Sequence, residues 1–555
     1  MKSSKAVDYD TKWLKKLQHG VPPPFQFVTE DATWSRAHCW EKLRSQRDKP
    51  LDFDVIVAGG EMGIFLAMAL QMKGFSVCVV DGADLVSDDT EWHVSMDELN
   101  ELKSLGILDQ ADIDAAIQTV LPETKGVKDV SVSPRILLER VATRFQLRGG
   151  SIFEQSPLMG VAVSEYTGVA VDLGEDKEPL TASLVIDCLG YNSPMARQQR
   201  YGMKPDGVCA VVGSCAAGFK KESDKKGESR FMTPKLQNSK NGKQQYFWES
   251  YPSEVGKTKK KGMFGFLPGY KNEVSAESDV KTTYLYTYMD AEERRTSLAS
   301  LMNDYWKMLS DVQPTIKDPA KDLDVKRVLF AYFPTYRDSP LKYSWSRMLA
   351  VDIQNPMNFG GFGPLVRHIG RISGAISEAL DNQCLHKDDL AAINAYMPSQ
   401  NVAHTFHEAL SARMGNEVDP KFVDRLLAGN FKAMKDVGPQ TINPFLQDIA
   451  RFGTLMEPFA RTVSNDSKML PPVVQEAGPP AFLEGMKHLG MMGIYSLLDS
   501  AVAPRMEAKL DDLSPRDRFK WRRRMEAWKV GSGNDFRKAK FEKTEGGKKS
   551  NNVEE

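Results

Sequence analysis

The sequence has little cysteine and no long apolar run. Its 555 residues include six cysteines, none in a CxxC pair, and a chain of this size buries a stable core without disulfides. This pattern predicts a reducing compartment. No stretch approaches the roughly 18 consecutive apolar residues of a spanning helix, and the longest apolar segment, residues 489–498, is about half that length. The sequence therefore argues against a membrane-spanning protein.

The chain also lacks an excess of charge of either sign. Lys and Arg total 73, Asp and Glu total 74, and the formal net charge is -1. Because nucleic-acid-binding surfaces are strongly basic, we expect no nucleic-acid partner. The first 20 residues contain acids and no apolar core, so they are typical neither of a secretory signal nor of a transit peptide.

Composition along the chain divides it into segments. At this length about three folding units are expected. Residues 1–50 are polar and predict an N-terminal extension, whereas residues 51–390 alternate short β-rich runs with helical stretches and predict an α/β domain. A β-sheet substrate domain is expected to be interleaved at approximately 200–335. Residues 391–530 predict a C-terminal helical region, and residues 531–555 are polar enough to predict a disordered tail.

A glycine turn follows the first strong strand of the α/β part. The apolar run of residues 54–57 leads into Ala58, Gly59, Gly60 and, three positions later, Gly63, after which a helix begins. Such a turn lets a pyrophosphate approach the backbone at a helix N-terminus. The next strand ends at Asp81, 21 positions past Gly60, where a carboxylate accepts from ribose hydroxyls. The order predicts a dinucleotide site, with Ala58 replacing the first glycine; the alternative is a tight turn in another doubly wound domain.

Two later clusters favour FAD over NAD. The strand of residues 184–187 ends in Asp187 and is followed by Gly190, which resembles the D-x-x-G element of FAD-dependent hydroxylases. The strand of residues 348–351 is followed by Asp352 and then by Gly360 and Gly361 before a helix. This resembles the element whose Asp meets the flavin ribityl chain. Three clusters in this order favour FAD, bound by a Rossmann-like α/β fold.

Seven strings lie in order along residues 52–504: GGEMGIFLAMALQMKGFSV, EWHVS, KPDGVCAVVGSCAAGF, QYFWESYP, TTYLYTYMDA, YFPTYRDSPLKYSW and NFGGFGPLVRHIGRI. Together they resemble the CruA/CruP-type lycopene cyclases, and CruP most closely. The resemblance implies an FAD-binding fold of the hydroxylase and geranylgeranyl reductase type, FAD that acts in its reduced form, and a linear carotene substrate. It also implies a redox-neutral cyclisation and a plastid or cyanobacterial setting, with the protein peripheral to a membrane or stromal.

The family pattern differs from this chain at two places. Asp352 follows Val351 where the family has glycine, and the loop after Asp352 is about three residues shorter. His93 stands where similar strings carry asparagine. In that family reduced FAD acts electrostatically and stabilises a cation; the sequence names neither an electron donor nor an oligomeric state.

The candidate acid for such a cyclisation is Glu249. Cyclising a linear end group requires a proton at a terminal alkene, a carbocation kept from water, and removal of a second proton. Glu249 follows Trp248 in an aromatic run, and aromatic faces hold a polyene and attract a cation. Trp248 is therefore expected to share the catalytic site. The alternative for Glu249 is a strand residue with its carboxylate in solvent, and Asp290 is a weaker second candidate acid.

Other features have plainer interpretations. His404 and His407 lack a third ligand at zinc-like spacing, so no metal site is expected. Cys209 and Cys215 are interpreted as small apolar strand residues. The basic run of residues 516–529 is either a membrane-surface helix or a solvated terminal helix. Two other functions stay open: a non-catalytic carotenoid-binding paralogue, and a flavin-dependent reductase or monooxygenase of another isoprenoid.

Overall fold

The structure is a computed structural model. No helix in the part that it describes is long and apolar enough to cross a membrane. It describes residues 26–30, 37–86, 92–120, 130–174, 176–190, 193–201, 203–219, 237–239, 242–253, 279–292, 295–313, 315–335, 345–351, 362–402, 432–436, 449–465, 474 and 478–535.

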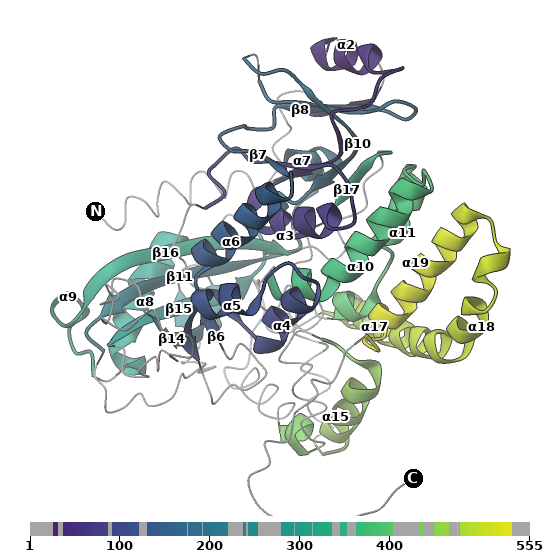
Figure 1. Cartoon of the computed structure of the whole chain (residues 1–555). Helices are drawn as coiled ribbons and strands as arrows, with labels where there is room; N and C mark the ends of the chain where they lie inside the picture. The colour runs from purple at the N-terminus through teal and green to yellow at the C-terminus, as the bar shows by residue number, and fades with distance from the viewer. Residues whose placement is uncertain are drawn as a thin grey trace, which may run out of the picture.

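A mixed sheet with a parallel centre forms the first layer (Figure 1). Its strand order is β1-β8-β9-β10-β2-β3-β7, and β17 pairs with β10. Strands β10, β2, β3, β7 and β17 run parallel, whereas β8, β9 and β10 form an antiparallel meander. The bounds are β1 (Val28–Glu30), β2 (Phe53–Ala58), β3 (Val77–Val80), β7 (Ser151–Phe153), β8 (Gly160–Ser164), β9 (Gly168–Asp172), β10 (Leu180–Asp187) and β17 (Met348–Ala350).

Helices cover this sheet because its central strands are apolar on both faces. Val55 and Val57 of β2 pack in a core with helices α3 (Gly60–Gln71), α6 (Pro134–Leu147) and α10 (Phe362–Asp381). Ile56 points the other way, into a core that includes Met195 of α7 (Pro194–Gln199). A near-continuous apolar run is what a parallel strand covered on both faces requires. The expected α/β class is therefore confirmed.

A four-stranded antiparallel sheet forms the second layer, and it lies in the interval where an interleaved sheet is predicted. Its order is β14-β15-β11-β16. One face packs on α8 (Leu298–Val312), which is followed by the short α9 (Pro319–Asp322). The strands are β11 (Gly207–Ala217), β14 (Phe247–Pro252), β15 (Val280–Met289) and β16 (Asp324–Thr335), and a separate hairpin comprises β12 (Gln237–Ser239) and β13 (Gly242–Gln244).

A small three-stranded sheet, β4-β6-β5, lies beside the first layer. Ser95 and Glu98 form a reciprocal capping box that starts α4 directly after β4. Asp109 and Asp112 do the same for α5. The bounds are β4 (Trp92–Val94), β5 (Ile117–Val120), β6 (Val130–Val132), α4 (Met96–Ser104) and α5 (Gln110–Ala116).

Both ends of the described chain add to the fold. In the segment predicted as an N-terminal extension, β1 joins the main sheet beside β8, and α2 (Ala37–Ser45) packs on β8 and β9. At the other end, Asp535 of the predicted tail forms a bidentate pair with Arg367 of α10. The later helices are α11 (Lys387–Ile393), α15 (Phe452–Asn465), α17 (Pro479–Leu497), η5 (Leu498–Val502), α18 (Ala503–Glu507), η6 (Leu510–Asp512) and α19 (Pro515–Gly531).

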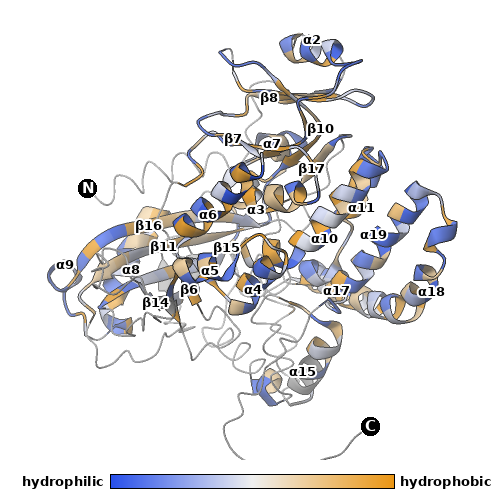
Figure 2. Ribbon diagram, viewed as in Figure 1, coloured by the Kyte–Doolittle hydropathy of each residue, from blue (hydrophilic) through white to orange (hydrophobic). Residues whose placement is uncertain are grey.

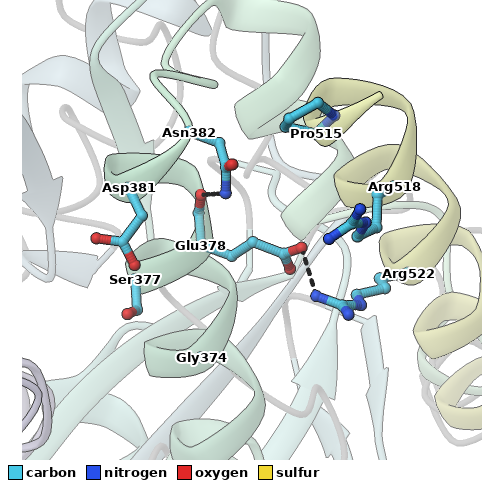
Figure 3. A pocket seen from close by; sticks show the side chains of 8 residues that line it. All are labelled: Gly374, Ser377, Glu378, Asp381, Asn382, Pro515, Arg518 and Arg522. Carbon is cyan, nitrogen blue, oxygen red and sulfur yellow. Dashed lines mark hydrogen bonds and ion pairs between the residues drawn. The ribbon is translucent and has the colours of Figure 1, made fainter. Parts of the chain in front are cut away.

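The basic helix α19 docks on α10 and α11 through ion pairs. Figure 2 shows its strongly hydrophilic colouring beside α10. Arg516 donates two hydrogen bonds to Asp389, at 3.0 and 2.9 Å. Arg522 and Arg523 both contact Glu378, and Figure 3 shows the first of these pairs in the pocket of about 330 Å³ between the helices. These arginines are engaged within the fold, whereas Arg524 and Lys529 of the same helix are exposed, so the membrane-surface and solvated interpretations of this run stay predictions.

Asp389→Asn is expected to loosen this docking. The Asp389 side chain is only 2% exposed and also lies 3.4 Å from Lys520, so its amide replacement leaves cations without their charged partner. We expect a loss of about 1–2 kcal/mol in the free energy of unfolding. Urea denaturation measures it. The neighbouring Asp388→Asn is the control, since that side chain is 73% exposed, and an equal loss in both variants would contradict the account.

Candidate functional site

The predicted cofactor clusters meet at one edge of the main sheet. Ala58, the last residue of β2, pairs with Val80 of β3 on one side and with Asp187 of β10 on the other. Asp187 pairs in turn with Ala350, the last residue of β17. Because these four strands are parallel, the residues that follow them leave the sheet at the same edge. Ligands of open α/β sheets bind at such carboxyl ends.

The glycine turn brings α3 unusually close to β10. Gly59 has φ +97°, and a Cβ there would lie 2.7 Å from the carbonyl carbon and oxygen of Cys188. A Cβ on Gly63 would lie 2.6 Å from Cγ1 of Val57, so this glycine permits close packing of helix on strand. Ala58 is a buried strand residue in an apolar core, and its methyl group is accommodated there and not in the turn.

Asp81 is held at the N-terminus of α3. Its Oδ2 accepts from the Gly60 amide at 2.6 Å, and its Oδ1 accepts from Ala83 N at 3.0 Å. The positive end of the helix dipole favours the charge. Each carboxylate oxygen of Asp81 keeps a lone pair, so each can accept one more hydrogen bond, for example from a ribose hydroxyl. Glu61 adds a second carboxylate to the first turn.

Asp187 shapes the loop after β10. Its carboxylate accepts from the amide of Leu189 at 3.0 Å and from the hydroxyl of Ser193, which caps α7. Gly190 takes a positive φ of 63° in the same turn. The structure thus gives Asp187 a structural role in the loop that follows the shared sheet edge.

The third predicted cluster is described only in part. Asp352, Gly360 and Gly361 lie outside the described residues, and their roles stay predictions. The helix after them, α10, begins at Phe362, whose ring lies 5.4 Å from that of Phe65 in α3 and 4.9 Å from that of Trp92 in β4. The start of α10 therefore packs against both the glycine-turn helix and the small sheet.

Glu249 is bound by two tyrosines on one face of the second sheet. Tyr251 donates to its Oε2 at 2.8 Å and Tyr286 to its Oε1 at 3.0 Å. Burial, and then the nearby Glu249 carboxylate, raises the pKa of Tyr286 well above its usual value, so this phenol stays a donor. We call this group the Glu249 cluster; it comprises Phe247, Glu249, Tyr251, Tyr284, Tyr286 and Tyr288.

Aromatic rings surround the carboxylate. Phe247 stacks on Tyr286 with centroids 5.3 Å apart, and Tyr288 meets both rings edge-on. A Cβ on Gly213 would lie 3.1 Å from Cδ1 of Tyr284, so the absent side chain leaves room for that ring over β11. The face is apolar and rich in π-electrons, with one half-buried acid.

Trp248 does not share this face. Successive strand residues point to opposite sides of a sheet, so Trp248 points away from the Glu249 carboxylate. Its indole stacks on Tyr305 of α8 at 5.1 Å and 12°. The expectation that Trp248 and Glu249 share one site was wrong, because adjacent residues of a strand place their side chains on opposite faces of the sheet.

His93 connects the Glu249 cluster to the small sheet, whose Val94 packs in the same core as α3. Its ring stacks on Tyr251 with centroids 4.0 Å apart and an interplanar angle of 24°. His93 belongs to β4, two residues before the cap of α4. The tyrosine partners of Glu249 were not predicted, although the alternation of Tyr284, Tyr286 and Tyr288 in the sequence places all three on one face.

The other candidate residues that the structure describes contact neighbouring residues of the fold. Asp290 pairs with Arg295. Cys209 of β11 is buried and pairs across the sheet with Tyr288 of the Glu249 cluster, and burial, followed by the Glu249 charge, raises the pKa of its thiol. Cys215 contacts Ser253, at 3.6 Å, and is a free thiol. His404 and His407 lie outside the described residues.

Comparisons find distant structural neighbours only. No protein-family model and no curated protein matches the chain. The halogenase PltM in complex with phloroglucinol and FAD is 12% identical, with 87% of this chain and 98% of that chain covered and a TM-score of 0.47. The flavin-dependent halogenase CmlS is 16% identical, with 75% of this chain and 78% of that chain covered and a TM-score of 0.45. The anhydrotetracycline hydroxylase OxyS from Streptomyces rimosus is 14% identical, with 72% of this chain and 76% of that chain covered and a TM-score of 0.42. The fold of this chain is assigned from its own strand order and register.

Proposed function

We propose that the protein is an FAD-dependent enzyme that cyclises an end group of a linear carotene without net oxidation or reduction. The observation that carries the proposal is the Glu249 cluster, a single carboxylate among aromatic rings on a sheet face that meets His93 of the small sheet. The sequence resemblance alone supports the carotene class and a plastid setting, where the protein is peripheral to a membrane or stromal.

The residues at the shared sheet edge fit FAD. Gly59 and Gly63 hold the start of α3 close to the strands without side chains in the way, and Asp81 offers carboxylate oxygens to a ribose. Asp81 accepts the N–H of Gly60, and the N–H groups that follow it in the first turn of α3 are placed by helix geometry to meet a pyrophosphate. When bound, reduced flavin supplies negative charge that stabilises a nearby cation.

The chain's own groups perform the proton transfers. Glu249 takes up a proton and delivers it from a carboxyl oxygen to the terminal double bond of the end group, which leaves a tertiary cation. The next double bond along the chain attacks this cation, which closes the ring and moves the positive charge to a ring carbon. Tyr251 and Tyr286 orient the carboxyl group through their hydroxyls. Glu249 then recovers a proton from a ring carbon, so protons and electrons balance.

Aromatic rings protect the cation between these steps. Phe247, Tyr286 and Tyr288 present π-faces and edges around the acid, and such rings attract a cation by about 0.5–2 kcal/mol each. The same rings exclude water, which would otherwise trap the cation as an alcohol.

Pigment analysis tests the proposal. The full chain is expressed in bacteria that accumulate lycopene, and the extract is compared with that of cells expressing the Glu249→Gln variant. We expect cyclic products only with the unmodified chain, and a flavin absorbance spectrum from the purified protein. Unchanged lycopene together with a folded, flavin-loaded protein would contradict the proposal.

A second candidate function is a carotenoid-binding paralogue without turnover. Two carboxylates, Asp81 and Glu61, lie at the helix end that a pyrophosphate would use, which favours weak retention of FAD. This alternative predicts a purified protein that retains carotenoid, lacks flavin and gives the same pigments with Glu249→Gln.

A further inference from the structure

Three different metal-ligand side chains converge between α2 and β9. The Nε2 atom of His38 lies 3.2 Å from Oδ1 of Asp172 and 3.6 Å from Sγ of Cys39. All three donor atoms lie within 4.8 Å of one another. His38 and Cys39 come from the first turn of α2, and Asp172 ends β9. In the described part of the chain this is the one such group of His, Cys and acidic side chains.

The spacing of the donors matches a tetrahedral site. With Zn–N and Zn–O distances of about 2.1 Å and a Zn–S distance of about 2.3 Å, tetrahedral angles place N and S about 3.6 Å apart and N and O about 3.4 Å apart. The observed separations are 3.6 and 3.2 Å. Two of the three separations therefore match those around a tetrahedral ion, and the third, between the thiol and the carboxylate, is within 4.8 Å.

A single imidazole nitrogen faces both the thiol and the carboxylate. One ring nitrogen carries either one hydrogen or one lone pair, so it makes one good hydrogen bond and not two. A cation between the three atoms accepts one lone pair from each of them. Asp172 Oδ1 also accepts from the Gly174 amide at 2.9 Å, and its second lone pair can bind the ion. Cys39 is fully buried and the Asp172 side chain is 7% exposed, whereas that of His38 is 48% exposed, which gives an ion a route from solvent.

We propose that His38, Cys39 and Asp172 bind a zinc-class divalent ion, with water at the fourth position. The ion joins α2 to β9 and so fastens the N-terminal segment to the main sheet. The site is independent of the proposed carotene chemistry, because its ligands lie outside the shared strand ends and the Glu249 cluster. A plain histidine–aspartate ion pair is the competing interpretation.

Cobalt titration of the full-length protein tests the site. After chelator treatment and removal of the chelator, Co²⁺ is added and the thiolate-to-cobalt absorption and the d–d bands of tetrahedral cobalt are recorded. We expect both to saturate at equal amounts of metal and protein, and Zn²⁺ to displace them. No such bands with the unmodified chain would overturn the proposal.

Variants assign the ligands. Cys39→Ala is expected to abolish the thiolate band, and His38→Gln, at a half-exposed position that folding tolerates, to weaken cobalt binding by more than about tenfold. Cys384→Ala is the matched control, since Cys384 is also a buried free thiol, and it should keep both bands. Bands that persist in both His38→Gln and Cys39→Ala overturn the proposal.

Discussion

Glu249→Gln is expected to lower turnover of a linear carotene by about 10²- to 10⁴-fold, which is the contribution typical of a general acid–base group. Glutamine keeps the size of the side chain and still accepts from Tyr251 or Tyr286, but it delivers no proton. We therefore expect the flavin content and the thermal unfolding midpoint to change little. Product formation per unit of purified protein measures the effect.

Asp304→Asn is the matched control for this variant. Asp304 also accepts a tyrosine hydroxyl, that of Tyr246 at 2.7 Å, but on the α8 side of the second sheet. Its loss should leave turnover within a few-fold of the unmodified enzyme. Equal losses in both variants would show that Glu249 acts only through the stability of the sheet.

Gly59→Ala is expected to lose bound FAD and to unfold at lower denaturant concentration. The residue has φ +97°, a conformation that costs an L side chain about 1–3 kcal/mol, and its new methyl group would lie 2.7 Å from backbone atoms of Cys188. Backbone atoms cannot rotate away as a side chain can, so the start of α3 must move from β10. Flavin absorbance and urea denaturation measure the two losses.

Gly74→Ala is the control that separates backbone strain at a positive φ from a steric clash of the new methyl group. Gly74 has φ +96°, almost the same as Gly59, but a Cβ there would meet nothing within 4 Å. It should lose stability by the conformational cost alone and keep FAD. Equal flavin loss in both variants would contradict the account that FAD binding depends on the close approach of α3 to β10.

The cofactor half of the fold was predictable because its signals are local. A strand, a glycine turn, a helix and a second strand ending in Asp81 follow one another in the sequence, and parallel register then brings Asp187 and β17 to the same edge. The contact of Asp81 with the Gly60 amide was not predictable, because the same spacing suits a carboxylate turned toward a ribose.

The Glu249 cluster was predictable only in part. The aromatic run marked Glu249, but strand alternation excludes Trp248 from its face, and the true partner Tyr286 comes from β15, 37 positions away. The docking of α19 was hidden for a different reason. The sequence shows a run of arginines but not their partners, because the acids that they contact, Glu378 and Asp389, lie more than 120 positions earlier.

Reaction in heavy water tests the central claim most directly. Purified protein loaded with FAD and a chemical reductant is mixed with lycopene in D₂O, and the product mass is determined. The account predicts a cyclic isomer with the hydrogen count of the substrate and deuterium in the new ring, because Glu249 delivers a solvent-derived proton. A product that has gained oxygen, or gained or lost two hydrogens, would contradict it.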